Sequence, residues 1–306
     1  MISIIIVSYN VSAMLRNCLR SIERETTSPY ELIIIDNASN DDSCTMIRRD
    51  FPYARLIVNE SNLGFAKANN QGLRIAEGEY VLFLNPDTLI LDGALDKMVA
   101  FLRDHPHIGI VGPHTLNADG VTTQATALYQ PSLWRAFHAH IPLWRLVPFW
   151  KPAVLGEYIP ECSRPVEVVK GSCMLMRTDL VRAIGGMNEQ YFMYAEEIDL
   201  CEAVRKQNLL VYYYTGARIV HFGGASTEAV SEEMVIHLYR STKKLFARRY
   251  QSSVLILQAL RVILMIGSIW RLIAWTLLTF IGNTSQARIK QRHHRAILRW
   301  LLYDYT

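Results

Sequence analysis

The sequence contains few cysteines, and they follow no familiar spacing. Five cysteines occur among 306 residues, and none belongs to a Cys-x-x-Cys pair. An odd number of widely spaced cysteines argues against a disulfide framework, and the missing pairs argue against a structural zinc site. We therefore expect free thiols in a reducing compartment at Cys18, Cys44, Cys162, Cys173 and Cys201.

A secretory signal is also missing, and acidic residues are scarce near the end of the chain. The apolar residues 1–7 lack a basic region and a small-residue cleavage site, so we expect no signal peptide and a cytosolic N-terminal part. Residues 240–299 hold a large share of the basic residues and very few acids, although the net charge is only +4. Such a tail predicts an anionic partner, either a membrane surface or a nucleic acid.

The composition is that of a folded protein. Hydrophobic residues make up 50% of the chain and charged residues 20%, which allows a large buried core. A length of 306 residues suits one domain of roughly 200–250 residues with an appendage. We expect a domain over residues 1–228 and a helical region over residues 229–306.

Short apolar runs alternate with helical patterns up to residue 105. The runs at 2–7, 32–35, 55–59 and 80–84 read as buried strands, and residues 12–25, 66–77 and 91–105 have helical spacing. This alternation predicts an α/β fold, in which a mostly parallel sheet lies between helices. Further strands are expected at 167–176, 209–214 and 218–220, helices at 180–184 and 198–207, and only helix from residue 231.

Polar side chains follow three of these apolar runs. Open α/β sheets bind ligands at the carboxyl ends of their strands, so we expect these clusters to line one site. They are Ser8, Tyr9 and Asn10; Asp36 and Asn37; and Asn85, Pro86 and Asp87.

Two groups of acids could carry chemistry. Asp87 lies on a turn beside a proline and could bind a divalent cation, although it could equally cap the next helix. Glu196, Glu197 and Asp199 lie at a predicted helix start, where acids also favour the helix dipole. Because adjacent carboxylates raise one another's pKa, the Glu196–Glu197 pair could supply a general base.

Two weaker signals accompany these acids. His221 precedes a pair of glycines, which would let the backbone approach a phosphate, but a lone histidine is more often a packed polar residue. Small residues alternate with larger ones over 62–70, ahead of a helix whose N-terminus could face an anion. A polar helix cap is the plain alternative.

Taken in this order, the segments resemble the family 2 inverting glycosyltransferases of GT-A fold, and most of all the bacterial rhamnosyltransferase-like members. The resemblance covers residues 2–226. It implies transfer of a sugar, with rhamnose as one candidate, from a dTDP- or UDP-linked donor to a glycan acceptor, with Mg²⁺ or Mn²⁺ as cofactor. A polyprenyl-diphosphate-linked acceptor and cell-surface polysaccharide synthesis follow from the same likeness.

The resemblance also assigns roles. Asp36 matches the residue that reads the pyrimidine base, Asp87 is the metal carboxylate of an Asp-x-Asp motif whose first position is Asn85, and His221 completes the metal site. Glu197 is the implied base, with Glu196 and Asp199 beside it. Other residues match binding segments: on the donor side Ser8, Tyr9, Asn10, Asn37, Gly64, Lys67 and Asn69, and on the acceptor side Gly171 and Ser172.

The chain departs from the family pattern at two positions. Glu197 stands where aspartate is more usual, and Ala203 stands where a basic residue often follows. Both departures put the geometry on the acceptor side in doubt.

The tail predicts a membrane-surface helix. Residues 254–282 are apolar, but Arg261 and Arg271 fall on one narrow side, which favours a helix lying in the interface on the cytoplasmic face of the inner membrane. Residues 286–302 add a second basic amphipathic stretch, and the aromatic, basic segment 134–151 could touch the same surface. Packing on the domain, packing on a second copy in a homo-oligomer, and a true span are the alternatives. Nucleic acid is disfavoured because apolar runs separate the basic residues.

Two rival functions remain open. A nucleotidyltransferase uses a similar sheet and metal, but the glycine-rich phosphate loop that normally opens it is missing after residue 7. A non-catalytic, membrane-associated protein that only binds nucleotide sugars would keep the same motifs, and metal-dependent turnover of the donor would exclude it.

Overall fold

The computed structural model describes residues 1–141, 157–223, 231–281 and 285–305. The chain divides into two compact units. The sheet unit comprises Met1–Tyr129 and Glu157–Glu228, and the helical unit comprises Gln130–Gly156 and Ala229–Thr306. The boundary expected at residue 228 stays a prediction, and residues 130–141 group with the C-terminal helices.

The sheet unit is built on a mixed sheet whose first half is parallel, which confirms the predicted α/β class. Its nine strands follow the order β3-β2-β1-β4-β11-β6-β12-β5, and β9 also pairs with β12. Strands β1 to β4 run parallel, whereas β11 runs antiparallel to both of its neighbours. The strands are β1 (Ile2–Ser8), β2 (Tyr30–Asp36), β3 (Arg55–Val58), β4 (Tyr80–Leu84), β5 (Thr88–Leu91), β6 (Ile108–Leu116), β9 (Arg164–Val166), β11 (Cys173–Arg177) and β12 (Leu210–His221). A small second sheet has the order β10-β7-β8, made of Val168–Val169, Ala127–Leu128 and Glu157–Tyr158.

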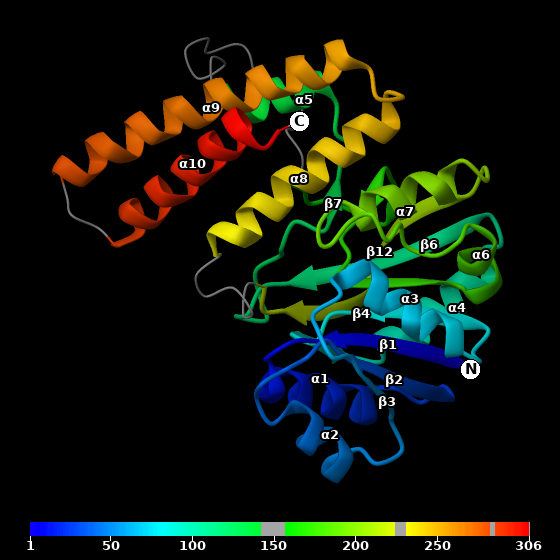
Figure 1. Cartoon of the computed structure of the whole chain (residues 1–306). Coiled ribbons are helices and arrows are strands. Elements are labelled where there is room, and N and C mark those ends of the chain that lie inside the picture. The colour runs from blue at the N-terminus through cyan, green and yellow to red at the C-terminus, as the bar shows by residue number, and fades with distance from the viewer. Residues whose placement is uncertain (142–156, 224–230, 282–284, 306) are drawn as a thin grey trace. The chain divides into compact units, whose positions relative to one another are not determined.

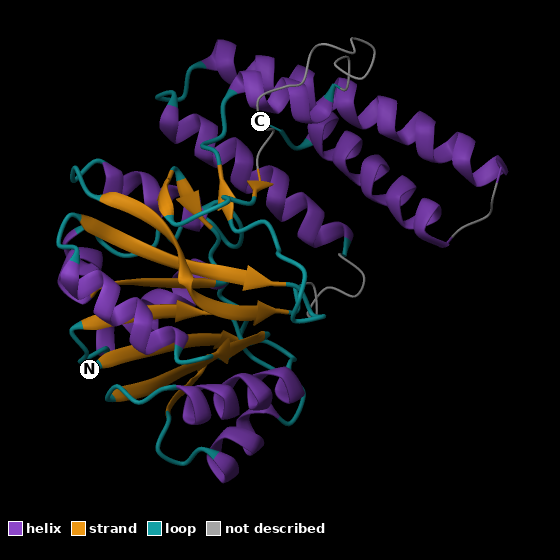
Figure 2. Cartoon of the chain, turned by 180° about the vertical axis from the view of Figure 1, so that it is seen from behind, coloured by secondary structure: helices purple, strands orange, loops and turns teal. Residues whose placement is uncertain are grey.

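Helices cover both faces of the large sheet (Figure 2). Alternate residues of a strand point to opposite faces, so Ile4 and Ile6 of β1 enter one core while Ile5 and Val7 enter the other. The first core includes α1 (Ser12–Glu25), α2 (Ser43–Asp50) and α4 (Ala94–Asp104). The second includes α3 (Phe65–Ile75), α6 (Thr178–Ala183) and α7 (Glu196–Arg205).

Several elements of the sheet unit differ from the prediction. Helix α2 and strands β5 and β6 had no counterpart in the sequence pattern, because α2 and β5 are short and Gly109, Gly112 and Pro113 interrupt β6. The strands expected at 209–214 and 218–220 form one strand, β12, whose register with β6 shifts between Tyr214 and Arg218. Thr215 and Gly216, two exposed residues between the predicted strands, lie at that shift.

The helical unit consists of α5 (Leu133–His140), α8 (Glu232–Arg249), α9 (Val254–Ile281) and α10 (Ser285–Tyr303), labelled in Figure 1. Helix α9 packs against the other three helices. The part of α9 over Val254–Thr279 has a mean hydropathy of 1.8 and is long and apolar enough to cross a membrane, judged by length and composition only. Most of the segment 134–151 that was expected to touch a membrane lies outside the described residues.

The arginines of α9 point into the helical unit, which corrects the predicted arrangement. Arg261 donates hydrogen bonds to the carbonyls of Leu301 and Leu302 at the end of α10, and Arg271 donates to the carbonyl of Ala139 near the end of α5. Cations are favourable at helix C-termini, where carbonyls lack partners within the helix. The two arginines therefore do not form a cationic stripe on the free face.

The free face of α9 is apolar. At about 100° per residue, most of its exposed large side chains fall on one stripe, which we call the apolar stripe of α9. The residues of this stripe are Leu255, Val262, Ile266, Ile269, Trp270, Ile273 and Leu277.

Candidate active site

The parallel strands bring the predicted nucleotide-binding residues to one edge of the sheet. Ser8 at the end of β1 lies beside Asp36 at the end of β2, and the Asn37 amide donates to the Ser8 carbonyl at 2.8 Å. Asp36 is fully buried, and its Oδ1 accepts a hydrogen bond from the Ser39 amide at 2.9 Å. Its Oδ2 and the Ser8 hydroxyl have no hydrogen-bond partner among the described residues. Buried polar atoms of this kind normally require a partner, and a ligand can supply it.

The loops after β1 and β2 are bound to each other. The amide of Asn10 donates to the Ser39 hydroxyl at 3.0 Å, and Oδ1 of Asn10 accepts from the Asn40 amide at 2.7 Å. Asn10 has a left-handed backbone with φ of 54°, which asparagine tolerates. Tyr9 is exposed beside it. Asn10 therefore holds the loop, and Tyr9 is the residue of this turn with an accessible ring.

Asn37 organises the next segment, which contains Gly64. Its side chain donates to Oδ1 of Asn62 at 2.9 Å and accepts from Asn59 and from the amide of Leu63. Gly64 has φ of +84°, and a Cβ there would lie 2.3 Å from the carbonyl oxygen of Phe192. Only glycine fits this close approach.

Helix α3 begins directly after Gly64 and carries the other predicted donor residues. Lys67 is exposed in its first turn, whereas Asn69 is buried and donates to the carbonyl of Phe65 at 3.0 Å. Asn70 ends the predicted segment 62–70, but no role of its own was expected from the sequence. Its side chain exchanges two hydrogen bonds with the backbone of Met187 and so fixes the segment that leads towards α7.

Asp87 and His221 are brought together by the pairing of β5 with β12. In this ladder His221 is opposite Thr88, so His221 Nε2 lies 3.3 Å from Oδ1 of Asp87. The same nitrogen lies 3.3 Å from Nδ2 of Asn85. On the other side of the ring, Nδ1 lies 2.9 Å from Oε1 of Gln124, an oxygen that can only accept. In a neutral imidazole, Gln124 therefore favours the tautomer in which Nδ1 carries the proton and Nε2 keeps its lone pair.

This arrangement fits a divalent cation. In that tautomer, the Nε2 lone pair of His221 and a carboxylate oxygen of Asp87 face each other, and a cation between them would relieve their repulsion. Both side chains are largely buried, with exposed fractions of 14% and 11%. Among the described residues no group of three or more His, Cys, Asp or Glu side chains could hold a metal ion. Two protein ligands alone bind weakly, so the remaining ligands would have to come from the substrate.

Gly171 and Ser172 connect the predicted metal-binding turn with the predicted base. The carbonyl of Ser172 accepts a hydrogen bond from the amide of Asn85 at 2.9 Å. A Cβ on Gly171 would lie 3.5 Å from the Cβ of Glu197. The segment before β11 therefore touches Asn85 on one side and Glu197 on the other.

The acids of α7 follow two strained residues. Tyr194 and Ala195 both have left-handed backbones, with φ of 68° and 71°, and no side chain caps the helix. Such conformations cost of order 1–3 kcal/mol each and persist where the surroundings impose them. They place Glu196 inside the protein and Glu197 in a half-buried position at the helix start.

The three acids of α7 have different environments. Burial, and secondly the neighbouring charge of Glu197, raise the pKa of Glu196 well above its usual range. Glu197 is the more exposed of the two, and its charge contributes to the raised pKa of Glu196. Asp199 is buried one turn further on, where it accepts a hydrogen bond from the side chain of Asn188 at 3.2 Å. That contact holds the preceding loop, and a direct role of Asp199 in catalysis stays a prediction.

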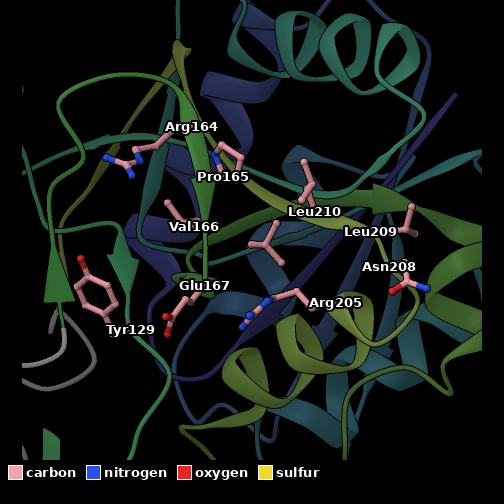
Figure 3. A pocket seen from close by; sticks show the side chains of 10 residues that line it. Tyr129, Arg164, Pro165, Val166, Glu167, Arg205, Asn208, Leu209 and Leu210 are labelled. Carbon is pink, nitrogen blue, oxygen red and sulfur yellow. The ribbon is translucent and has the colours of Figure 1, made fainter.

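A separate pocket lies at the far end of β12 from His221. It has a volume of about 490 Å³, and Arg164, Glu167, Arg205 and Asn208 are among its lining residues (Figure 3). None of the predicted site residues lines it. The candidate active site is therefore the sheet edge with Asp87 and Glu197, not this pocket.

Comparison with known proteins decides the family. The sequence pattern of Glycosyl transferase family 2 matches residues 3–162, which is more than half of the chain. The chain belongs to glycosyl transferase family 2. Its relatives are glycosyltransferases, which favours this activity over the rival nucleotidyltransferase.

Two relatives illustrate how family 2 members resemble this chain. The N-acetylglucosaminyl-diphospho-decaprenol L-rhamnosyltransferase of Mycobacterium tuberculosis is 28% identical over 260 residues, covering 81% of this chain and 84% of that protein. The low-salt glycan biosynthesis hexosyltransferase Agl10 of Haloferax volcanii is 27% identical over 212 residues, covering 68% of this chain and 62% of its own length.

Solved structures show the same fold at low sequence identity. A mannosyltransferase from Pyrobaculum calidifontis, in complex with GDP-Man and Mn²⁺, has a TM-score of 0.59 at 17% identity, covering 99% of this chain and 87% of that chain. GalNAc-T7 with UDP, GalNAc and Mn²⁺ has a TM-score of 0.57 at 14% identity, covering 84% of this chain and 52% of that chain. These likenesses confirm the predicted GT-A architecture.

Proposed function

We propose that this family 2 enzyme transfers a sugar with inversion from a nucleoside diphosphate donor to a hydroxyl of a polyprenyl-diphosphate-linked glycan. Support for the donor comes from the buried, unpartnered oxygens at the ends of β1 and β2. The acceptor class rests on the name of the mycobacterial relative, as does rhamnose as the favoured sugar. The donor nucleotide is proposed to be dTDP or UDP, with Asp36 reading the pyrimidine.

Each group at the site has one task in the proposed displacement. Glu197 takes the proton of the acceptor hydroxyl while that oxygen attacks the anomeric carbon, and Gly171 leaves room beside the carboxylate. Asp87 and His221 would hold Mg²⁺ or Mn²⁺, which stabilises the negative charge on the leaving diphosphate. Gln124 keeps the Nε2 lone pair of His221 available by accepting a hydrogen bond from the Nδ1–H group.

The observation that carries the proposal is the approach of Asp87 to His221 at 3.3 Å. It can be tested with Asp87→Asn, with Asp92→Asn as the matched control, because Asp92 is exposed and pairs with Arg218 on the surface. We expect Asp87→Asn to reduce Mn²⁺-dependent release of the nucleoside diphosphate about a thousandfold, and Asp92→Asn to leave it unchanged. A panel of nucleotide sugars in the same assay identifies the donor. Full turnover by Asp87→Asn would exclude the proposed metal site.

Gln124 allows a finer measurement. Replacing it with leucine removes the acceptor for Nδ1, so the affinity for Mn²⁺ in the presence of nucleoside diphosphate should fall about 10–100-fold. Metal titration of the full chain measures the change directly. An unchanged affinity would mean that His221 is not a ligand.

We also propose that the enzyme works at the cytoplasmic face of the inner membrane and is held there by the helical unit. The apolar stripe of α9 lacks a cover among the described residues, and the arginines of α9 are bound to carbonyls inside the unit. Exposed basic residues on α10 would suit anionic lipid headgroups. A second copy of the chain is the alternative cover for the stripe, and no role in binding nucleic acid is proposed.

A further inference from the structure

The helical unit contains a cavity between α8 and α10 that the transfer reaction does not use. Its volume is about 440 Å³. Arg292, Arg295 and Arg299 line it from α10, and Arg240 lines it from α8. The spacing of the α10 arginines, three and four residues apart, places them on one face of that helix. The two helices pack against each other and can be followed in yellow and red in Figure 1.

The charges of these guanidinium groups are only partly balanced by the protein. All four arginines are exposed, and within the described parts of the chain no ion pair joins any of them to an acid. Like charges three or four residues apart on a helix repel each other, so this grouping costs stability unless an anion binds. Trp300, buried and packed edge-on against Tyr239 and Tyr305, gives the cavity an ordered wall.

The acids that line the cavity have another explanation. Glu232 and Glu233 occupy the first turn of α8, where acids favour the helix dipole, and Glu233 lies 3.8 Å from His237. Asp304 is the remaining acid of the lining. The four arginines therefore leave a net positive cavity even with all three acids charged.

We propose that this cavity binds phosphate groups at a site separate from the diphosphate site of the transfer reaction. Guanidinium groups form paired hydrogen bonds with phosphate oxygens, and a cluster of them matches a dianionic or diphosphate group better than a single carboxylate. The ligand is either the phosphate of a lipid headgroup or a soluble phosphate or diphosphate, since both present the same oxygens.

A matched pair of variants tests the site in the full chain. Arg295→Gln with Arg299→Gln removes two positive charges from the cavity. Arg288→Gln with Lys290→Gln removes two exposed charges from the same helix outside the cavity. Inorganic pyrophosphate is titrated calorimetrically in the presence of EDTA, so that the metal-dependent site does not contribute. We expect the cavity variant to lose about tenfold or more in affinity and the control variant less than about twofold.

Vesicles distinguish the source of the phosphate. If it is a lipid headgroup, pyrophosphate releases the protein from phosphatidylcholine vesicles that contain phosphatidylglycerol, and the cavity variant binds these vesicles more weakly than the control. If it is soluble, the two variants bind the vesicles equally while their affinities for pyrophosphate still differ. Equal affinities of the two variants for pyrophosphate, or no binding by the unaltered protein, would overturn the site. Transfer to a water-soluble acceptor should stay unchanged in both variants, so this test is independent of the proposed function.

Discussion

The sheet unit and the helical unit use their polar side chains in opposite ways. At the sheet edge, Asn10 and Asn37 bind the backbone of neighbouring loops, and a few buried oxygens such as Oδ2 of Asp36 are left over. In the helical unit, Arg261 and Arg271 donate hydrogen bonds to carbonyls near the C-terminal ends of α10 and α5, which lack partners within those helices. The side chains that remain exposed on α9 are mostly apolar. Function is therefore indicated by unsatisfied polar atoms at the sheet edge and by uncovered apolar surface on α9.

The largest expected effect is a loss of sugar transfer that leaves membrane binding unchanged. Glu197→Gln removes the proposed base and should lower the turnover number about 10²–10⁴-fold without changing vesicle binding. Glu202→Gln is the matched control, because Glu202 lies on the same helix and pairs with Lys206. Turnover of both variants with a soluble acceptor measures the difference. Near-normal turnover of Glu197→Gln would refute the assignment of the base.

The second prediction concerns how the loops at the sheet edge are held. Gly64→Ala would put a Cβ 2.3 Å from the Phe192 carbonyl, whereas Gly120→Ala meets nothing within 4 Å although Gly120 also has positive φ, at +67°. Both replacements strain the backbone, but only the first forces two segments apart. We expect a loss in unfolding free energy of about 2–4 kcal/mol at Gly64 and about 1 kcal/mol at Gly120. Denaturant unfolding decides this, and equal losses would show that the contact with Phe192 is unimportant.

The third prediction tests the uncovered surface of the other unit. Ile266→Asn combined with Ile273→Asn changes two exposed residues of the apolar stripe, so the melting temperature should stay nearly constant. If the stripe enters a bilayer, partition into vesicles should fall about tenfold or more, because each isoleucine contributes roughly 1.5–3 kcal/mol when buried. Sedimentation with vesicles measures partition. If partition is unchanged and the oligomeric state alters instead, a second copy covers the stripe.

The smallest expected effect concerns Glu196. Because its pKa is raised in the folded state, Glu196 favours folding at low pH, and that contribution is lost as the pH rises from the usual glutamate range through the raised value. Glu196→Gln removes this loss, so the variant should gain stability relative to the unaltered protein at pH 8 and little at pH 4. A gain of about 1 kcal/mol corresponds to roughly 2–4 °C in melting temperature. Thermal melts at the two pH values test it, and a gain that is the same at both would contradict the shift.

The sequence was sufficient to predict the parallel half of the sheet. The runs that became β1, β2 and β4 are buried on both faces, and such strands are recognisable as unbroken apolar segments. The polar residues after them fall at the sheet edge because parallel strands end on the same side. The family resemblance added roles that no pattern could supply.

The other features of the site and of α9 could not be predicted, because they depend on contacts between residues far apart in the sequence. Gln124 lies 97 positions from His221, and nothing around it distinguishes it from any loop glutamine. Asp41 accepts hydrogen bonds from the amides of Ser12 and Ser43, and the pairing with Ser12 could not be deduced from the sequence pattern. The exposed side of α9 could not be deduced either, since two arginines normally mark the aqueous face of a helix.

Those two arginines have a consequence for how hydropathy is read. In a hydropathy average, Arg261 and Arg271 lower the score of α9 and make the helix look less suited to a lipid bilayer. In the folded unit, their hydrogen bonds to the ends of α10 and α5 occupy carbonyls that would otherwise need water. The two arginines thus satisfy helix-end carbonyls without the help of water. The apolar face of α9 can therefore enter the hydrocarbon of a bilayer, which an unpaired arginine would avoid.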